Sequence, residues 1–391
     1  MLAAPADDPV THFLILCLRG RFDTGALDEA RDWAVAQELD WRAIDDLATR
    51  ASLAPILYAL LRKQTWFPAD ILQRWHRAYL TTALINTLSL LELARIGDAF
   101  GEAGIPFITL KGAALLGQVY KNVALRPMAD LDLLVHREHM AQASGIIQAM
   151  GYAPNHEEEH PGMFLAYENE IALQRPGTRH TMIVELHWSL IDSPYYQERL
   201  PMAWFWKTVI SERVGELTTL ILGPEATLLH LTAHLMLHHQ GKGLRWLHDI
   251  AEVICHFDAA IDWDLLLKQA SDFRLTLPVQ QALPVVATRW RAPVPTAALE
   301  ALARLEASPE EQRIFAQMTR ANASPGRRLL RDLSGMSGRR RRMRFLWLKL
   351  FPSPAYMQRR YGVSHPGLTL FYYPYRWLQG LTDLFRGGKH E

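Results

Sequence analysis

Cysteine is scarce in this sequence, and its scarcity argues against two classes of protein. Cys17 and Cys255 are the only cysteines among 391 residues, and neither belongs to a Cys-x-x-Cys or Cys/His ligand spacing. A disulfide framework and a structural zinc ribbon are therefore not expected. Reduced thiols are typical of the cytoplasm, where we expect the protein to act.

Long apolar runs and excess charge are lacking as well. No run approaches the roughly 18 apolar residues of a transmembrane helix. The short apolar run of residues 13–18 follows acids and not a positive cluster, which argues against a secretory signal. The 42 basic and 41 acidic side chains nearly cancel, so charge alone indicates no partner.

Apolar residues are plentiful enough for a substantial core. A composition of 49% apolar and 21% charged residues argues against general disorder and predicts about two or three compact units. Between residues 22 and 104 apolar residues recur every three or four positions, as at Leu84, Leu88 and Leu91. We therefore expect an N-terminal helical region over residues 1–104.

Strand and helix patterns alternate from residue 105 onwards. Gly104 and Pro106 break the helical spacing. The elements expected after them are a strand at 105–110, a helix at 113–120, a strand at 131–135, a helix at 138–150, and strands at 171–174 and 182–188. This order predicts a small mixed sheet with helices over residues 105–215.

The rest of the chain is expected to be helical and then basic. Residues 216–325 are predicted to form a helical domain that closes a cleft, and residues 326–391 a basic aromatic tail. Residues 327–360 carry eleven Lys or Arg against Asp332 alone, a balance of 11 − 1 = +10. Such a tail could contact an anionic membrane, follow a nucleic-acid backbone or form a solvated arm.

Two acids separated by one residue, Asp130 and Asp132, carry a strong chemical signal. Because Leu131, Leu133 and Val135 are apolar, a strand here buries one face and projects both carboxylates from the other. Like charges held together need a cation, and Mg²⁺ prefers oxygen ligands of this kind. The alternative is a solvated edge strand with two surface acids.

A third acid lies in a later predicted strand. Glu185 is flanked by Val184 and Leu186, so it lies mid-strand in apolar company and needs a partner. Three carboxylates on neighbouring strands form the ligand set of a two-metal phosphoryl-transfer site. Glu170, just before the preceding strand, is a competing third ligand.

Basic residues near these acids suit a phosphate. Lys111 and Gly112 follow the first strand, where glycine allows close backbone approach and a helix N-terminus favours an anion. Arg126 precedes Asp130 by four residues and can reach the same space as a phosphate clamp. The alternatives are a common glycine turn and an ordinary exposed arginine.

A family resemblance rests on three ordered segments: LKG at Leu110–Gly112, RPMADLDLLV at Arg126–Val135 and ELHW at Glu185–Trp188. They resemble the polymerase-β-type nucleotidyltransferase superfamily and, more narrowly, a bacterial group of uncharacterised nucleotidyltransferases. The resemblance is specific over residues 105–190 and looser up to residue 255. It implies an α+β fold, a small mixed-sheet nucleotidyltransferase core flanked by N-terminal and C-terminal helical domains.

The resemblance also implies roles for individual residues. It places the catalytic and metal-binding acids at Asp130, Asp132 and Glu185, and the nucleotide contacts at Lys111, Gly112, Arg126 and His187. The family's turn usually continues with glycine or serine, whereas Ala113 follows Gly112 here. Phosphate contact at this turn is therefore expected to depend more on Lys111.

A histidine stripe marks the later helical segment. His230, His234 and His238 are spaced by four and share one helical face. In the family that the chain resembles this helix faces the cleft, which implies substrate contacts for the set His234, His238, Arg245 and Asp249. The alternative is a metal-dependent phosphohydrolase of the HD type at His248 and Asp249, although its spacing from His234 is short.

The expected reaction follows from the resemblance. It moves a nucleoside monophosphate from an NTP to an acceptor and releases pyrophosphate, with Mg²⁺ as cofactor and Mn²⁺ as an alternative. The acceptor stays open among a small molecule, a sugar phosphate, a protein and an RNA end. A non-catalytic nucleotide-sensing protein with the same fold is the alternative function, and residues 327–377 could add peripheral membrane contact.

Overall fold

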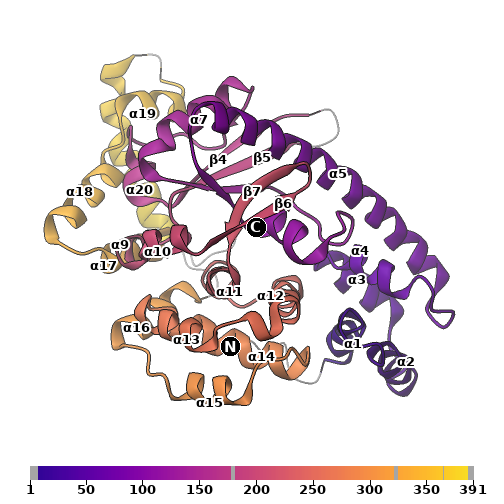
Figure 1. The fold of residues 1–391 in the computed structure, drawn as a ribbon. Coiled ribbons are helices and arrows are strands. Elements are labelled where there is room, and N and C mark those ends of the chain that lie inside the picture. Colours follow the sequence, from indigo (N-terminus) through magenta and orange to yellow (C-terminus); the bar gives the residue numbers. More distant parts are fainter. Residues whose placement is uncertain (1–7, 178–180, 321–324, 364, 386–391) are drawn as a thin grey trace.

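The computed structural model describes residues 8–177, 181–320, 325–363 and 365–385. The chain begins with the helices α1 Pro9–Arg19, α2 Ala26–Ala36, α3 Trp41–Arg50, α4 Ala54–Leu61 and α5 Ala69–Glu102. Asp8 and Asp40 start α1 and α3 by accepting hydrogen bonds from backbone N–H groups. The expected N-terminal helices are confirmed, and Figure 1 shows α5 extending from α3 and α4 to the sheet.

The centre of the molecule is a seven-stranded sheet in the order β3-β4-β5-β2-β1-β7-β6. Its strands are β1 Phe107–Thr109, β2 Leu131–Val135, β3 Ala153–Pro154, β4 Glu170–Arg175, β5 Met182–His187, β6 Val209–Val214 and β7 Leu217–Leu222. Because β2 is antiparallel to β1 and parallel to β5, the sheet is mixed. The predicted α+β fold class is confirmed.

Two parts of this sheet are not among the expected strands: the short edge strand β3 and the β6–β7 hairpin. Gly215 adopts a left-handed φ of +63° in its two-residue turn. β7 then pairs in parallel with β1, with Ile108 opposite Leu220. The sheet therefore continues beyond residue 215, the predicted end of the core, to Leu222. The division of the chain into domains otherwise stays a prediction.

Helices connect the strands and cover the sheet. The connecting helices are α6 Lys111–Leu115, the π-helical η1 Leu116–Tyr120, the 3₁₀ turn η2 Arg137–His139, α7 Met140–Ala149, α8 Met163–Tyr167, α9 Pro194–Arg199 and α10 Met202–Lys207. After the sheet come α11 Pro224–Ala233, the π-helical η3 His234–His238, α12 Leu244–Phe257, the 3₁₀ turn η4 Asp258–Ala260, α13 Trp263–Asp272, α14 Thr276–Arg289, α15 Thr296–Arg304 and α16 Pro309–Met318. Figure 1 shows α11 to α16 grouped below the sheet.

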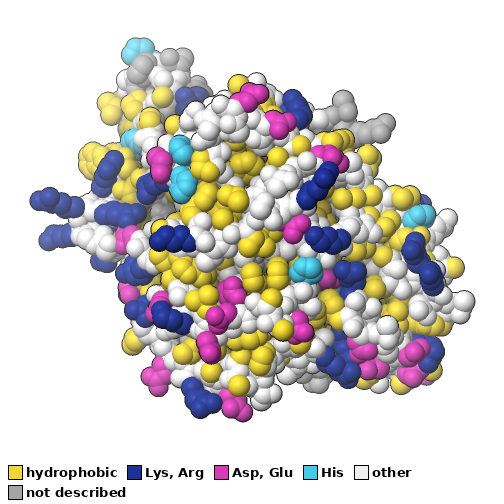
Figure 2. Space-filling view, viewed as in Figure 1, with side chains coloured by type: hydrophobic (Ala, Val, Ile, Leu, Met, Phe, Trp, Pro, Cys, Tyr) yellow, Lys and Arg dark blue, Asp and Glu magenta, His cyan; other side chains and the backbone are white. Residues whose placement is uncertain are grey.

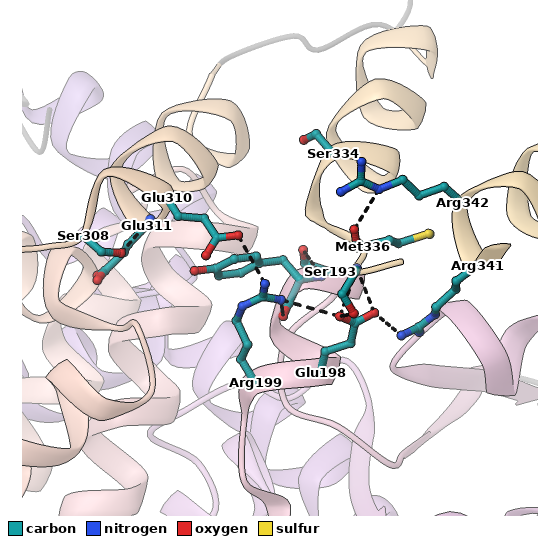
Figure 3. Close-up of polar contacts among 12 residues, drawn as sticks. Ser193, Glu198, Arg199, Ser308, Glu310, Glu311, Ser334, Met336, Arg341 and Arg342 are labelled. Atoms are coloured by element: carbon teal, nitrogen blue, oxygen red, sulfur yellow. Dashed lines mark hydrogen bonds and ion pairs between the residues drawn. The ribbon is translucent and has the colours of Figure 1, made fainter. Parts of the chain in front are cut away.

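The tail forms helices that fold back on the core: α17 Pro325–Gly335, α18 Arg339–Leu350, α19 Pro354–Tyr361, the 3₁₀ turn η5 Pro366–Phe371 and α20 Tyr372–Phe385. A small apolar cluster joins Met336 and Phe345 of the tail to Met163 and Tyr167 of α8. Arg341 also pairs with Glu198 of α9, as Figure 3 shows. Figure 2 shows Lys and Arg side chains gathered at the edge where Figure 1 places α17 and α18.

No helix within the described ranges combines the length and apolar character needed to cross a bilayer.

Candidate active site

The acids expected at the site meet on adjacent strands. β2 and β5 run parallel with Asp132 directly opposite Glu185. All residues of β2 are buried, because the strand lies inside the sheet. Asp130 precedes Asp132 by two residues and so projects from the same face. Asp130, Asp132, Glu185 and Glu170 of β4 are called the acid cluster below.

Lys111 contacts this cluster directly. It is the first residue of α6 and has a left-handed φ of +44°, an unusual conformation for a side chain other than glycine. Its Nζ lies 2.7 Å from Asp132 Oδ1 and 3.6 Å from Glu185 Oε2. Burial alone would lower the pKa of Lys111, but these two carboxylates outweigh it and raise the pKa above its usual value.

His187 links two of the acids. Its Nε2 lies 3.0 Å from Asp132 Oδ1, and its Nδ1 lies 3.0 Å from Glu170 Oε2. Burial opposes the charged imidazole, but Glu170 and Asp132 outweigh burial and raise the pKa of His187 well above its usual value. In return, against the effect of burial, His187 lowers the pKa of Glu170 to about 2. Glu170, the competing third ligand, thus faces an imidazolium.

Asp130 is the least compensated member of the cluster. It has no hydrogen-bond or ion-pair partner within the ranges that the structure describes. Burial, and then the charges of Asp132 and Glu185, raise its pKa to about 7. Asp130 would therefore gain from a cation that replaces the water it has lost and offsets its two acidic neighbours.

The cluster fits a divalent cation. Its four carboxylates face one ammonium and one imidazolium, a balance of 2 − 4 = −2 when all groups are ionised. Carboxylate oxygens of Asp132 and Glu185 lie within 4.8 Å of one another and of a nitrogen of His187, which would have to be neutral to bind a metal itself; Asp130 lies outside this group. Clustered carboxylate oxygens with this excess charge are the environment that Mg²⁺ prefers.

Arg126 is buried and paired, not exposed. Its guanidinium donates to Asp249 through Nε at 3.0 Å and Nη2 at 3.0 Å. Tyr120 also donates its hydroxyl hydrogen to Asp249, at 2.7 Å. Asp249 is 0% exposed, so its carboxylate is fully engaged inside the protein. This pair ties α12 to the loop that precedes β2.

Gly112 is needed because Arg126 passes it closely. A Cβ at this position would lie 2.6 Å from Nη1 of Arg126 and 2.9 Å from Met128 Cγ. The close approach that the sequence predicts for a phosphate is therefore made, in this structure, by an arginine side chain.

Arg245 is a cation that has no acidic ion-pair partner among the residues that the structure describes. Its guanidinium lies over the ring of Trp246, 4.4 Å from the centroid. Its Nε is buried and makes no hydrogen bond to any of these residues. Burial, and then the nearby charge of Arg126, lower the pKa of Arg245. An unsatisfied cation of this kind favours an anionic ligand.

The histidines form a ladder beside Trp246. The rings of His234 and His238 stack at 5.0 Å, and His239 stacks on Trp246 at 4.6 Å. Burial, and then the charge of Lys111, hold the pKa of His234 well below its usual value. His230 is buried beneath them. The predicted contacts His234, His238 and Arg245 therefore lie close together, whereas Asp249 is enclosed by Arg126 and Tyr120.

Three further residues meet at this site without a pattern in the sequence that marks them: Tyr120, Trp246 and His239. For the last of these alone, the adjacent pair His238 and His239 is a usable signal. The π-helical turn of η3 brings His239 Nε2 within 3.0 Å of His234 Nε2, five residues earlier. A helix with regular spacing would not have placed these two rings together.

The alternative phosphohydrolase site is not assembled. His248 is buried, with Nε2 3.2 Å from Glu252 and Nδ1 accepting from Trp290 at 3.3 Å. Within the described ranges, the residues grouped as a metal site are Asp132, Glu185 and His187, not His248 with Asp249.

Comparisons with known proteins indicate a family. A family model described as uncharacterised nucleotidyltransferase matches residues 37–291. A search of curated proteins gave no match. Among solved structures, an antigenic nucleotidyltransferase-like protein from Paracoccidioides brasiliensis is similar at 13% identity and a TM-score of 0.34, over 57% of this chain and 95% of that one.

Proposed function

The chain belongs to this family of uncharacterised nucleotidyltransferases, and on that premise we propose that it transfers a nucleoside monophosphate from an NTP to an acceptor hydroxyl, releasing pyrophosphate. The carrying observation is the acid cluster: Asp132 and Glu185 lie in register on parallel strands, with Asp130 beside them. Their excess negative charge has no evident use in a protein that binds no cation.

Asp130, Asp132 and Glu185 would hold Mg²⁺, with Mn²⁺ as the alternative. When bound, the metal would polarise the α-phosphate and favour attack by the acceptor oxygen. His187 would orient Asp132, since its Nε2 lies 3.0 Å from that carboxylate, while its Nδ1 lies 3.0 Å from Glu170. His187 is thus a positioning residue in this proposal, in place of a nucleotide contact.

The triphosphate would contact Lys111 and Arg245. Lys111 neutralises Asp132 in the metal-free protein, and a dication there leaves its ammonium available for phosphate oxygens. Arg245 supplies a buried Nε that makes no hydrogen bond. Arg126, which Asp249 already satisfies, would fix the loop before β2 and not clamp a phosphate. Trp246 and His234 would flank the base.

The test measures pyrophosphate release from each of the four NTPs in the presence of a fractionated cell lysate. We expect release that requires Mg²⁺ and falls at least about 100-fold in Asp132→Asn, because a metal ligand is lost. Asp272→Asn, an exposed acid on α13, is the matched control and should retain wild-type release. Release that survives EDTA would contradict the proposal.

A non-catalytic nucleotide sensor is a second candidate. The ion pair of Lys111 with Asp132, at 2.7 Å, engages one oxygen of a proposed metal ligand, as a purely binding site would allow. A sensor would bind an NTP, with Arg245→Gln weakening the binding, and would release no pyrophosphate with any lysate fraction. A reacting enzyme would consume the bound NTP.

A further inference from the structure

Cavities lie between the acid cluster and the C-terminal tail. The first, of about 350 Å³, is lined by Lys111, Glu170 and His187 on the core side. The second, of about 810 Å³, is mainly acidic: six carboxylates, Glu170 and Glu185 among them, line it beside three Lys or Arg, so it suits the hydroxyl end of a ligand and not an anion. Asp192 borders both, so they adjoin at the edge of the cluster. Volumes of this size suit a small molecule.

The tail supplies basic side chains to these walls. Arg331 of α17 lines the first cavity and Arg360 of α19 the second. Both also line a third, adjoining cavity of about 900 Å³, so they can face one common ligand. Arg331 contacts Asp332 through Nε and Nη2, which leaves a third nitrogen, Nη1, outside this pair. Arg360 is exposed and, within the described ranges, has no ion-pair partner.

The first cavity borders the nucleotide side, because Lys111 and His234 line it. The second and third are separate from the groups suggested for the nucleotide: Lys111, His234, Arg245 and Trp246 line neither. In phosphoryl transfer the attacking and leaving oxygens lie roughly in line on opposite sides of phosphorus. A second substrate therefore needs its own space beside the acids, and the tail side of the cluster offers it.

We propose, resting on the function above, that the second and third cavities bind the acceptor and that it is a small hydroxyl compound carrying an oxyanion. The oxyanion, a phosphate or a carboxylate, contacts Arg331 and Arg360. The hydroxyl faces Glu185: its oxygen bonds to the α-phosphorus, the bond from that phosphorus to the bridging oxygen breaks, pyrophosphate leaves, and Glu185 takes the proton. The tail thereby belongs to the substrate site.

The test measures binding of two probes, glycerol 3-phosphate and glycerate, by calorimetry in EDTA. All proteins are full-length and carry Arg245→Gln, so that an anion bound at that residue does not contribute. Adding Arg331→Gln and Arg360→Gln should raise the dissociation constant of the probe about tenfold or more, because at least one charge-assisted hydrogen bond is lost. The matched control adds Arg339→Gln and Arg340→Gln, exposed arginines of α18 that line none of the three cavities.

The probe that binds identifies the oxyanion as phosphate or carboxylate. The acceptor site would be overturned if the Arg331/Arg360 variant and the Arg339/Arg340 control had equal dissociation constants. It would also be overturned if neither probe bound to the parent protein that carries Arg245→Gln alone. A wild-type protein that releases no pyrophosphate, yet binds a probe through Arg331 and Arg360, would reject the proposed reaction and not the oxyanion site. The two failures are therefore distinguishable.

Discussion

Lys111 takes the position beside Asp132 that a cation would need, with a side chain only 12% exposed. Lys111→Met leaves Asp132 and Glu185 without this ammonium, and breaking a buried ion pair costs about 3 kcal/mol. In EDTA we expect this variant to unfold at a lower urea concentration than the wild type. Mg²⁺ should stabilise the variant more than the wild type, because no ammonium competes for the carboxylates. Equal responses to Mg²⁺ would contradict the placement of the metal.

Asp249 is predicted to matter for stability more than for substrate contact. Asp249→Asn keeps the shape but leaves the buried charge of Arg126 unpaired, which should cost about 3 kcal/mol in urea unfolding. Asp272→Asn removes an acid from the exposed pair with Lys268, whose side chains are 51% and 67% exposed, and should cost less than about 0.5 kcal/mol. Similar losses in both variants would show that the Arg126 pair is not a structural anchor.

At the scale of single residues, the sequence predicts which acids gather and not which cations they meet. Period-two spacing is enough to align Asp130 and Asp132. The partner of Arg126 lies 123 residues away, and no local pattern encodes such a contact. The contact between Lys111 and Asp132 is not readable from the sequence either, because it depends on the pairing of β1 with β2. The sequence therefore indicates a phosphate, and not an acid, as the partner of Lys111.

At the scale of elements, a predicted strand or helix agrees with the structure where its own residues are enough to determine it. β2 occupies the predicted residues 131–135. The apolar residues at alternate positions of this segment are enough to predict a buried strand. The β6–β7 hairpin carries a usable signal, two β-rich runs separated by Gly215 and Glu216, yet helical spacing around it obscures the pair. The π-helical turns η1 and η3 have no sequence signature and arise from packing.

Two glycines test how η1 packs on the hairpin. A Cβ on Gly117 of η1 would lie 2.7 Å from Val214 Cγ2 and 3.0 Å from the carbonyl oxygen of Arg213, so Gly117→Ala should cost about 1–3 kcal/mol. A Cβ on Gly145 of α7 meets nothing within 4 Å, so Gly145→Ala should stabilise by about 0.5–1 kcal/mol. Chemical denaturation measures the change in the free energy of unfolding for each variant. A change of the same sign in both would refute the close packing of η1.

At the scale of the whole molecule, one apolar core runs from α1 through the sheet to α16, whereas the tail relies on its own small cluster. The charge excess of the tail is partly balanced on the core: Lys349 pairs with Glu159 and Arg359 with Glu157. These pairs favour a tail that packs on the protein over one that serves as a solvated arm. Membrane contact through residues 327–377 stays a prediction.

Phe345 and Trp347 distinguish a packed tail from a loosely attached one. Both lie on α18, but Phe345 is 2% exposed, with its ring 4.8 Å from that of Tyr167, while Trp347 is 60% exposed. Phe345→Ala should favour local opening of the tail by about 3 kcal/mol, which corresponds to about 100-fold faster trypsin cleavage at the arginines of residues 339–344. Trp347→Ala removes a ring of similar size that contributes little burial, so its cleavage rate should stay within about threefold of the wild type. Equal acceleration in both variants would mean that the cluster on α8 does not hold the tail, and the acceptor cavities would then lack a fixed wall.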